Sequence, residues 1–181
     1  MEPQDTALII VDVQRDFCPG GALATARGNE VAEKIAVIQG GYSTVVATQD
    51  WHIDPAGHFS PEPDYADTWP VHCVAETKGS ELHPALAPVD AHCRKGEYSA
   101  AYSGFEGNCA GTPLEEWLRG RGIAKLDIVG IATDHCVQAT ANDALRAGFD
   151  VRVLRELCSA VDEKRGDAAL EQLAQDGAEV V

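Results

Sequence analysis

The chain has 181 residues, of which 45% are hydrophobic and 24% charged, a composition that predicts one globular domain over residues 1–181. Its 14 lysines and arginines against 29 aspartates and glutamates give a net charge of −15, which argues against nucleic acid as a partner. No apolar stretch is long enough to span a bilayer and the N-terminus lacks signal-peptide features, so we expect a cytoplasmic protein with no membrane partner.

Short apolar runs alternate with segments whose apolar residues recur at helical spacing. A long loop at about 51–79 contains four prolines and several aromatic residues, which favours an ordered, functional loop. At 112–121 we predict a helix with Thr112 as its N-cap, Pro113 in the first turn and Glu115 three residues after the cap. In chain order, we expect strands at 6–13, 43–50, 89–96, 125–133, 150–156 and 178–181, and helices at 29–39, 112–121, 135–147 and 167–175.

This alternation predicts a three-layer α/β/α fold with a mainly parallel central sheet. In such sheets ligands bind outside the carboxyl ends of the strands, so the residues at those ends matter most. Ionisable residues stand at four of the predicted strand ends. They are Asp12, Asp50, Lys95 and Cys136.

Three of these residues form a plausible set for amide hydrolysis, namely Asp12, Lys95 and Cys136. A carboxylate can take the proton of a thiol, a cation can support the developing negative charge, and the same carboxylate can later activate water. Each residue taken alone has an ordinary structural explanation. Asp12 could cap a loop at the strand end, Lys95 could be a solvated surface charge, and Cys136 could be a small buried residue.

Cys136 lies where a predicted strand passes into a helix, within the sequence GIATDHCVQATANDAL. A helix N-terminus and a nearby lysine stabilise a thiolate, so we expect a lowered pKa and a reactive, exposed sulfur that a thiol reagent modifies. The six cysteines show no Cys-x-x-Cys pair, and we expect free, mostly buried thiols. Cys18 is the nearest rival as a nucleophile because it follows Asp12 closely.

A second group of side chains follows the strand that ends at Asp50. Residues two apart on an extended chain point to the same side, so Asp50 and His52 can share a target. His58 and His72 come from the long loop, and imidazoles with a carboxylate suit Zn, Fe or Mn better than Ca or Mg. The alternative is that these histidines cap loop backbone; His83, His92 and His135 are weaker candidates, and His135 could brace the turn before Cys136.

Several segments together resemble the nicotinamidases, which lie within the isochorismatase-like cysteine hydrolases. They cover about residues 6–160, in order, and are IIVDVQRDF with CPGGAL, TQDWH, GHFS, WPVHC, KGEYSAAYSGF and GIATDHCVQATANDAL. The resemblance implies hydrolysis of nicotinamide to nicotinate and ammonia through a cysteine thioester. It implies that Asp12 is the general base and acid, Lys95 the supporting cation and Cys136 the nucleophile.

The same resemblance implies the rest of the site. The peptide between Ile131 and Ala132 would be the family's cis bond, and the backbone N–H groups of Ala132 and Cys136 would form the oxyanion hole. One divalent metal ion (Zn, Fe or Mn) would orient the pyridine ring. Its ligands would be Asp50, His52, His58 and His72, and the substrate pocket would be lined by Phe17, Trp69, Tyr102 and Ile131.

Three alternatives stay open at this stage. A relative with the same triad could act on another substrate, such as an N-carbamoyl amide or isochorismate. A metal-bound water could perform the hydrolysis, with Cys136 only packed in the core. The fold could also serve a binding module without catalysis. The sequence leaves open whether the protein is a monomer or a homo-oligomer.

Overall fold

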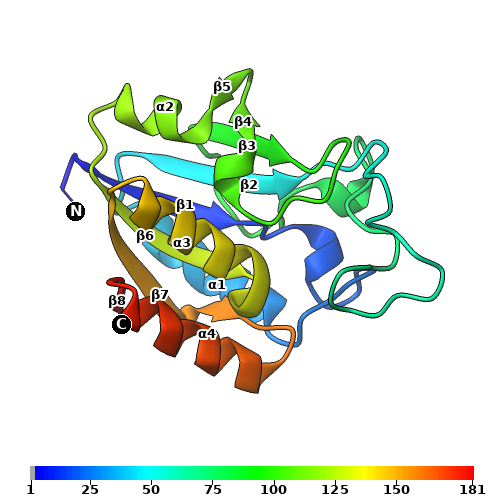
Figure 1. Cartoon of the computed structure of the whole chain (residues 1–181). Coiled ribbons are helices and arrows are strands. Elements are labelled where there is room, and N and C mark those ends of the chain that lie inside the picture. The colour runs from blue at the N-terminus through cyan, green and yellow to red at the C-terminus, as the bar shows by residue number, and fades with distance from the viewer. Residues whose placement is uncertain (1–2) are drawn as a thin grey trace.

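In the computed structural model, which describes residues 3–181, the strands form one eight-stranded sheet in the order β5-β4-β3-β2-β1-β6-β7-β8 (Figure 1). No helix within these described residues is long and apolar enough to cross a membrane. The strands are β1 Thr6–Val11, β2 Val45–Asp50, β3 Ala91–Lys95, β4 Asn108–Cys109, β5 Thr112–Pro113, β6 Lys125–Ile131, β7 Asp150–Ser159 and β8 Glu179–Val180. The α-helices are α1 Gly28–Gln39, α2 Leu114–Arg119, α3 Gln138–Arg146 and α4 Glu163–Gln175.

The sheet is mainly parallel, as the sequence predicted. β1 pairs in parallel with β2 and β6, β2 with β3, β6 with β7, and β7 with β8, whereas β4 and β5 join antiparallel at the β3 edge. The carboxyl ends of β1, β2, β3 and β6 therefore lie at one edge of the sheet. The loops beyond β2 and β3 gather on that side (Figure 1).

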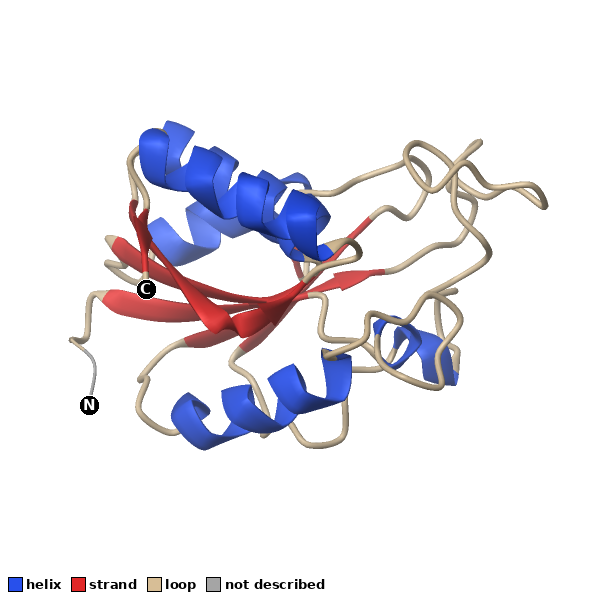
Figure 2. Ribbon diagram, turned by 90° about the horizontal axis from the view of Figure 1, so that it is seen from below, coloured by secondary structure: helices blue, strands red, loops and turns tan. Residues whose placement is uncertain are grey.

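Helices cover both faces of the sheet, which gives the three layers of the fold (Figure 2). On one face, Val31 and Ile35 of α1 pack with Ile10 of β1. On the other face, α2, α3 and α4 pack in one apolar cluster with Ile9 and Ile128. Alternate residues of the central strands thus enter opposite cores, which explains why β1 is buried at every position and apolar from Ala7 to Val11.

The predicted start of the 112–121 helix is wrong. Thr112 is not an N-cap, because it pairs with Cys109 in a short antiparallel hairpin, and α2 begins two residues later at Leu114. Ala110 and Gly111 form the turn of this hairpin with φ values of 53° and 93°. Two-residue hairpins favour positive φ at both turn positions, but two-residue strands show no period that the sequence could reveal.

Three other elements differ from their predicted bounds by three or more residues at one end. The helix predicted at 135–147 begins as a π-helical turn, Thr133–Val137, and continues as α3. β7 extends to Ser159, and α4 begins four residues earlier than predicted, at Glu163. The Asp162 carboxylate accepts a hydrogen bond from the Arg165 N–H and so caps α4, an N-terminal signal that the polar sequence around it concealed.

The expectation that all six cysteines are free thiols is also wrong. Cys93 of β3 and Cys109 of β4 stand directly opposite each other in the antiparallel pair and form a disulfide. The other four, Cys18, Cys73, Cys136 and Cys158, are free and buried. The pairing was hidden because it depends on β4, which the sequence did not predict.

We expect reduction of this disulfide to destabilise the fold. The two cysteines are 16 residues apart, and releasing a loop of that size costs about 3 kcal/mol, or roughly 6–12 °C in Tm for a chain of this length. Iodoacetamide labelling of denatured protein, followed by mass spectrometry, should count four thiols before reduction and six after it. Six labelled thiols without reductant would contradict the pairing.

Candidate active site and metal site

The four ionisable residues at the strand ends converge, as predicted, at one edge of the sheet. Lys95, the last residue of β3, reaches across to the other strands, and its Nζ lies 2.8 Å from Asp12 Oδ2 and 3.7 Å from Cys136 Sγ. Nζ also contacts Asp50 Oδ1. One ammonium group therefore joins a thiol to two carboxylates.

Burial argues against the ordinary explanations for two of these residues. Asp12 has no exposed surface and Lys95 is only 2% exposed, so Lys95 is not a solvated surface charge. The Asp12 carboxylate does not cap a loop, because its partners are Lys95 and the Thr48 hydroxyl, which donates to Oδ1 at 2.6 Å. A buried carboxylate and ammonium persist in a core only when they pair in this way.

The charge states follow from this shared burial. Burial raises the pKa of the Asp12 carboxyl, and Lys95 opposes that shift only in part. Burial also acts to raise the pKa of Asp50, but Lys95, followed by the neighbouring His52 and His72, holds it well below its usual range. Burial acts to lower the pKa of Lys95, yet Asp12 and Asp50 raise it well above its usual value. Lys95 and Asp50 are charged, and Asp12 is the stronger base of the two carboxylates.

The structure contradicts the expectation of a lowered pKa and an exposed sulfur at Cys136. Burial raises the pKa of this thiol well above its usual value; Lys95 lowers it, while Asp12 and Asp50 raise it further. The residue is 8% exposed and lies in a pocket. The resting sulfur is therefore a thiol that needs a base, and the sequence could not show that burial, together with two carboxylates from other strands, outweighs the lysine.

Gln14 is a buried residue of the site that the sequence did not single out. Its side-chain amide donates to the backbone carbonyls of Asp50 and Ser80, each at 2.9 Å, and accepts from the Asp50 N–H at 2.9 Å. The amide thereby continues the pairing between the β1 and β2 segments after the ladder of the two strands has ended. This contact fixes the backbone that carries the Asp50 carboxylate.

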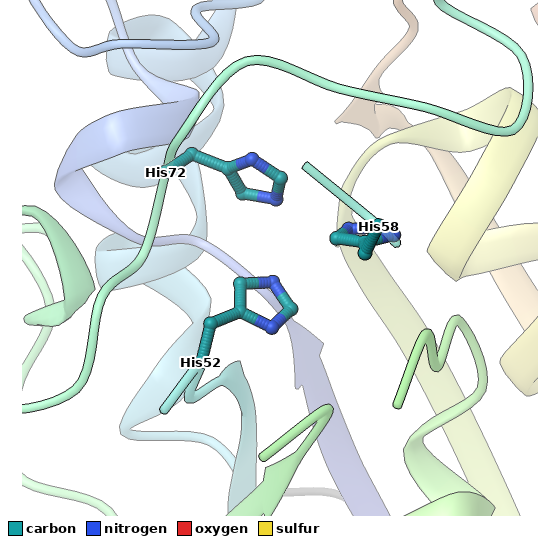
Figure 3. Close-up of side chains that lie close together, drawn as sticks. All are labelled: His52, His58 and His72. Atoms are coloured by element: carbon teal, nitrogen blue, oxygen red, sulfur yellow. The ribbon is translucent and has the colours of Figure 1, made fainter. Parts of the chain in front are cut away.

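The histidine group beside the triad is compact. His52, His58 and His72 are all buried, and each offers a ring nitrogen within 4.8 Å of the others (Figure 3). Asp50 Oδ2 lies 3.5 Å from His52 Nε2 and 3.6 Å from His72 Nε2. As predicted, Asp50 and His52 face a common point, and the loop folds back to add His58 and His72.

The protonation of the three histidine rings suits metal coordination, because each ring can offer an unprotonated nitrogen. His52 Nδ1 and His72 Nδ1 lie 2.7 Å from the carbonyls of Gly96 and Pro70, an arrangement that places the proton on Nδ1 and leaves the Nε2 lone pair for coordination. Burial, followed by the neighbouring His52 and His72, lowers the pKa of His58 to about 4, so this ring is neutral near pH 7.

Two buried atoms in the same group lack hydrogen-bond partners, namely His52 Nε2 and His58 Nδ1. Buried polar atoms are rarely left unsatisfied, and a metal ion would satisfy imidazole nitrogens here. Gly96 packs directly against the His52 ring: its φ is +74°, and a Cβ there would lie only 2.8 Å from His52 Cε1, so a larger residue would displace the ring. The donor set therefore fits one divalent cation, and the alternative of histidines that only cap the loop leaves these atoms unexplained.

A pocket that is partly open to solvent joins Cys136 to the histidine group. All four predicted substrate-binding residues line it, together with Asp50, His58, His72, Ala132 and Cys136. Trp69 Nε1 donates a hydrogen bond to the Tyr102 hydroxyl at 3.1 Å, which ties two of the aromatic walls together. Cys18 lies outside this lining, and burial raises its pKa to about 11.

The sequence did not predict five of the residues that line the pocket. They are Leu23, Thr25, Ala101, His135 and Val161. His135 packs edge-on against Trp69, with ring centroids 5.1 Å apart, so it forms a wall of the pocket. Its position next to Cys136 was the one available signal; the other four are small or aliphatic residues in loops and carry none.

Comparison with known proteins places this architecture in a family. The family model described as the isochorismatase domain matches residues 6–181, nearly the whole chain. The chain belongs to the isochorismatase family. The peptide bond between Ile131 and Ala132 is cis, as the resemblance to this family predicted.

Within the family, the similar proteins include nicotinamidases and pyrazinamidases. The nicotinamidase/pyrazinamidase of Mycobacterium tuberculosis is 50% identical over 181 residues, covering 97% of each chain. The pyrazinamidase of Pyrococcus horikoshii, solved in complex with zinc, superposes with a TM-score of 0.84 at 38% identity over 98% of each chain. PnC1 from L. infantum, solved with nicotinate, gives a TM-score of 0.85 at 33% identity over 97% of this chain and 91% of the other.

Proposed function

We propose that this protein hydrolyses nicotinamide to nicotinate and ammonia. The observation that carries the proposal is the pocket that joins the Cys136 thiol, in contact with Lys95, to three buried histidines. A flat ring fits between the aromatic walls, with its amide at the sulfur and its ring nitrogen at the histidines. The 50% identity to a nicotinamidase/pyrazinamidase supports the same substrate.

In the first half of the reaction, Asp12 removes the proton of the Cys136 thiol. The raised pKa of Asp12 makes it a better base near neutral pH than an ordinary carboxylate, and Lys95 stabilises the thiolate as it forms. The sulfur attacks the amide carbon, and the amide nitrogen takes the proton from Asp12 and leaves as ammonia. The product of this half is a nicotinoyl thioester on Cys136.

In the second half, Asp12 takes a proton from water as the water attacks the thioester. The C–S bond breaks, Asp12 returns its proton to the Cys136 sulfur, and the nicotinic acid that forms leaves and ionises to nicotinate. Each addition places negative charge on the carbonyl oxygen. The backbone N–H groups of Ala132 and Cys136 would stabilise that oxygen, since both residues line the pocket at the turn that carries the sulfur.

Asp50, His52, His58 and His72 would hold one divalent ion, for which Zn, Fe and Mn are the candidates. The ion, when bound, would supply a Lewis-acidic partner for the pyridine nitrogen and ordered waters. Asp50 has a double role in this arrangement, because one carboxylate oxygen faces the histidines while the other contacts Lys95.

Metal removal is expected to lower the stability of the protein. A ligand present at about 100 times its Kd stabilises the folded state by about 2.7 kcal/mol, or roughly 5–10 °C in Tm for a chain of this size. Differential scanning fluorimetry should show this loss after chelation and its recovery with added Zn²⁺. His72→Asn should abolish the response and His83→Asn, outside the histidine group, should keep it; an equal response in both variants would argue against the site.

The function is tested by incubating purified protein with nicotinamide and measuring ammonia and nicotinate together. We expect equal amounts of both products. Benzamide, which lacks the ring nitrogen, should react far more slowly if that nitrogen is held at the histidines. Absence of nicotinate after addition of Zn²⁺, Fe²⁺ and Mn²⁺ in separate trials would refute the proposal, and turnover of an N-carbamoyl amide instead would redirect it within the family.

A further inference from the structure

Asp134 is a buried carboxylate next to the nucleophile turn that neither the triad nor the histidine group uses. Its side chain is 3% exposed and lies within the π-helical turn Thr133–Val137, two residues before Cys136. A buried carboxylate requires hydrogen-bond or charge partners. These partners show which segment of the chain packs against the Thr133–Val137 turn.

The partners come from the corner between β7 and α4. Asp134 Oδ1 accepts a hydrogen bond from the Val161 N–H at 2.9 Å, and Oδ2 accepts one from the Asp162 N–H at 3.1 Å. The Arg165 guanidinium of the same corner adds a charged partner, with Nε 3.4 Å from Oδ2. Within the turn itself, His135 Nε2 lies 3.9 Å from Oδ2. A single carboxylate thus binds two successive backbone groups and one side chain of the same corner.

The corner itself belongs to the pocket. Val161 lines the pocket together with Cys136, although it is 42% exposed. Behind it, Gly166 packs so closely that a Cβ there would lie 2.7 Å from Ala160 Cβ and 3.6 Å from Thr133 Cβ. The distance from the sulfur to this wall of the pocket therefore depends on the contact between Asp134 and the corner.

We propose that Asp134 is a positioning residue that fixes the Cys136 turn against the β7–α4 corner and so holds the sulfur in register with the substrate amide. The proposal rests on the proposed hydrolysis for its kinetic part. It assigns a role to the C-terminal segment, which supplies no member of the triad and no histidine of the metal group. A displacement of about 1 Å in such a turn is enough to lower a rate by about 10²-fold.

Asp134→Asn is the informative variant because it keeps the size of the side chain. In the variant, an amide NH₂ replaces one carboxylate oxygen, and this group cannot accept a hydrogen bond from the backbone N–H that it faces. The turn therefore loses one hydrogen bond to the corner and its ion pair with Arg165. We expect kcat for nicotinamide to fall at least 10-fold while KM changes less than 3-fold. The rate of Cys136 alkylation by iodoacetamide, mapped by mass spectrometry, should also change by at least 3-fold.

A control variant separates positioning from general loss of stability. Asp127→Asn changes another buried carboxylate, whose partners are the Arg152 and Tyr42 side chains, and none of these three residues lines the pocket. This variant should lower Tm yet keep kcat and the alkylation rate within 2-fold of wild type.

All variants are assayed at 10 °C in sucrose, which favours the folded state, so that a reduced Tm does not prevent the measurement. If Asp134→Asn keeps both kcat and the alkylation rate within 2-fold of wild type and of Asp127→Asn, the proposal is wrong. The alkylation rate needs no substrate. A wild-type protein that fails to hydrolyse nicotinamide would therefore remove the proposed function while the role of Asp134 is still decided.

Discussion

Replacement of Cys136 with alanine is expected to lower kcat for nicotinamide by at least about 10⁴-fold and to leave the fold intact. No other free cysteine lines the pocket within the described residues 3–181, so no second sulfur can replace the lost one. The stability of the protein should change little, since burial raises the pKa of this thiol and keeps it neutral, so its removal leaves no charge without a partner. Ammonia release and thermal unfolding, measured on the same preparation, check both parts.

The matched control for this variant is Cys158→Ala. Cys158 is also buried and free, and burial raises its pKa to about 12, but it lies outside the pocket. We expect this variant to keep the wild-type rate. Retention of most of the activity by Cys136→Ala would instead favour hydrolysis by a metal-bound water, the alternative in which Cys136 is only a packed residue.

The triad residues and Asp50 could be predicted from the sequence because each lies at a strand end or close to it. Parallel strands covered on both faces are continuous apolar runs, so their ends are visible, and the polar residue that follows is conspicuous. Asp12, Asp50 and Lys95 were found in this way, and the alternation of elements was enough to place them at one edge of the sheet.

The parts that could not be predicted depend on pairings between distant segments. The β4–β5 hairpin has strands of two residues, too short for any period, and the Cys93–Cys109 disulfide depends on it. The pKa of Cys136 could not be inferred either. A helix end and a lysine suggest a thiolate, but the direction is decided by burial and by two carboxylates from other strands.

Lys95→Met is expected to cause the largest loss of stability and to abolish activity. Lys95 is the shared cation of two buried carboxylates, and removal of one partner of a buried pair costs about 3–5 kcal/mol because it leaves uncompensated charge behind. Methionine preserves much of the apolar stem, so the loss reports the charge. Urea unfolding of wild type and variant measures this loss of stability.

The control is Lys125→Met, at the exposed amino end of β6. This variant should change the free energy of unfolding by less than about 0.5 kcal/mol.

The pH dependence of this loss identifies its cause. Burial already raises the pKa of Asp12, and loss of Lys95 removes the influence that lowers it, so the pKa of Asp12 should rise further in the variant. A carboxyl group whose pKa is higher in the folded than in the unfolded state destabilises the fold as pH rises between those two values. The free-energy difference between wild type and Lys95→Met should therefore be smaller at pH 5 than at pH 8.

A second substitution makes the same argument independent of pH. Asp12→Asn should stabilise the Lys95→Met protein, because it removes one of the two unpaired charges, whereas in the wild type it should be neutral or destabilising because it deprives Lys95 of a partner. This change of sign is the signature of charge pairing in a double-mutant cycle. A loss that is the same at both pH values and is not relieved by Asp12→Asn would mean that Lys95 stabilises the sheet edge through the packing of its stem, and the ammonium would then matter for catalysis alone.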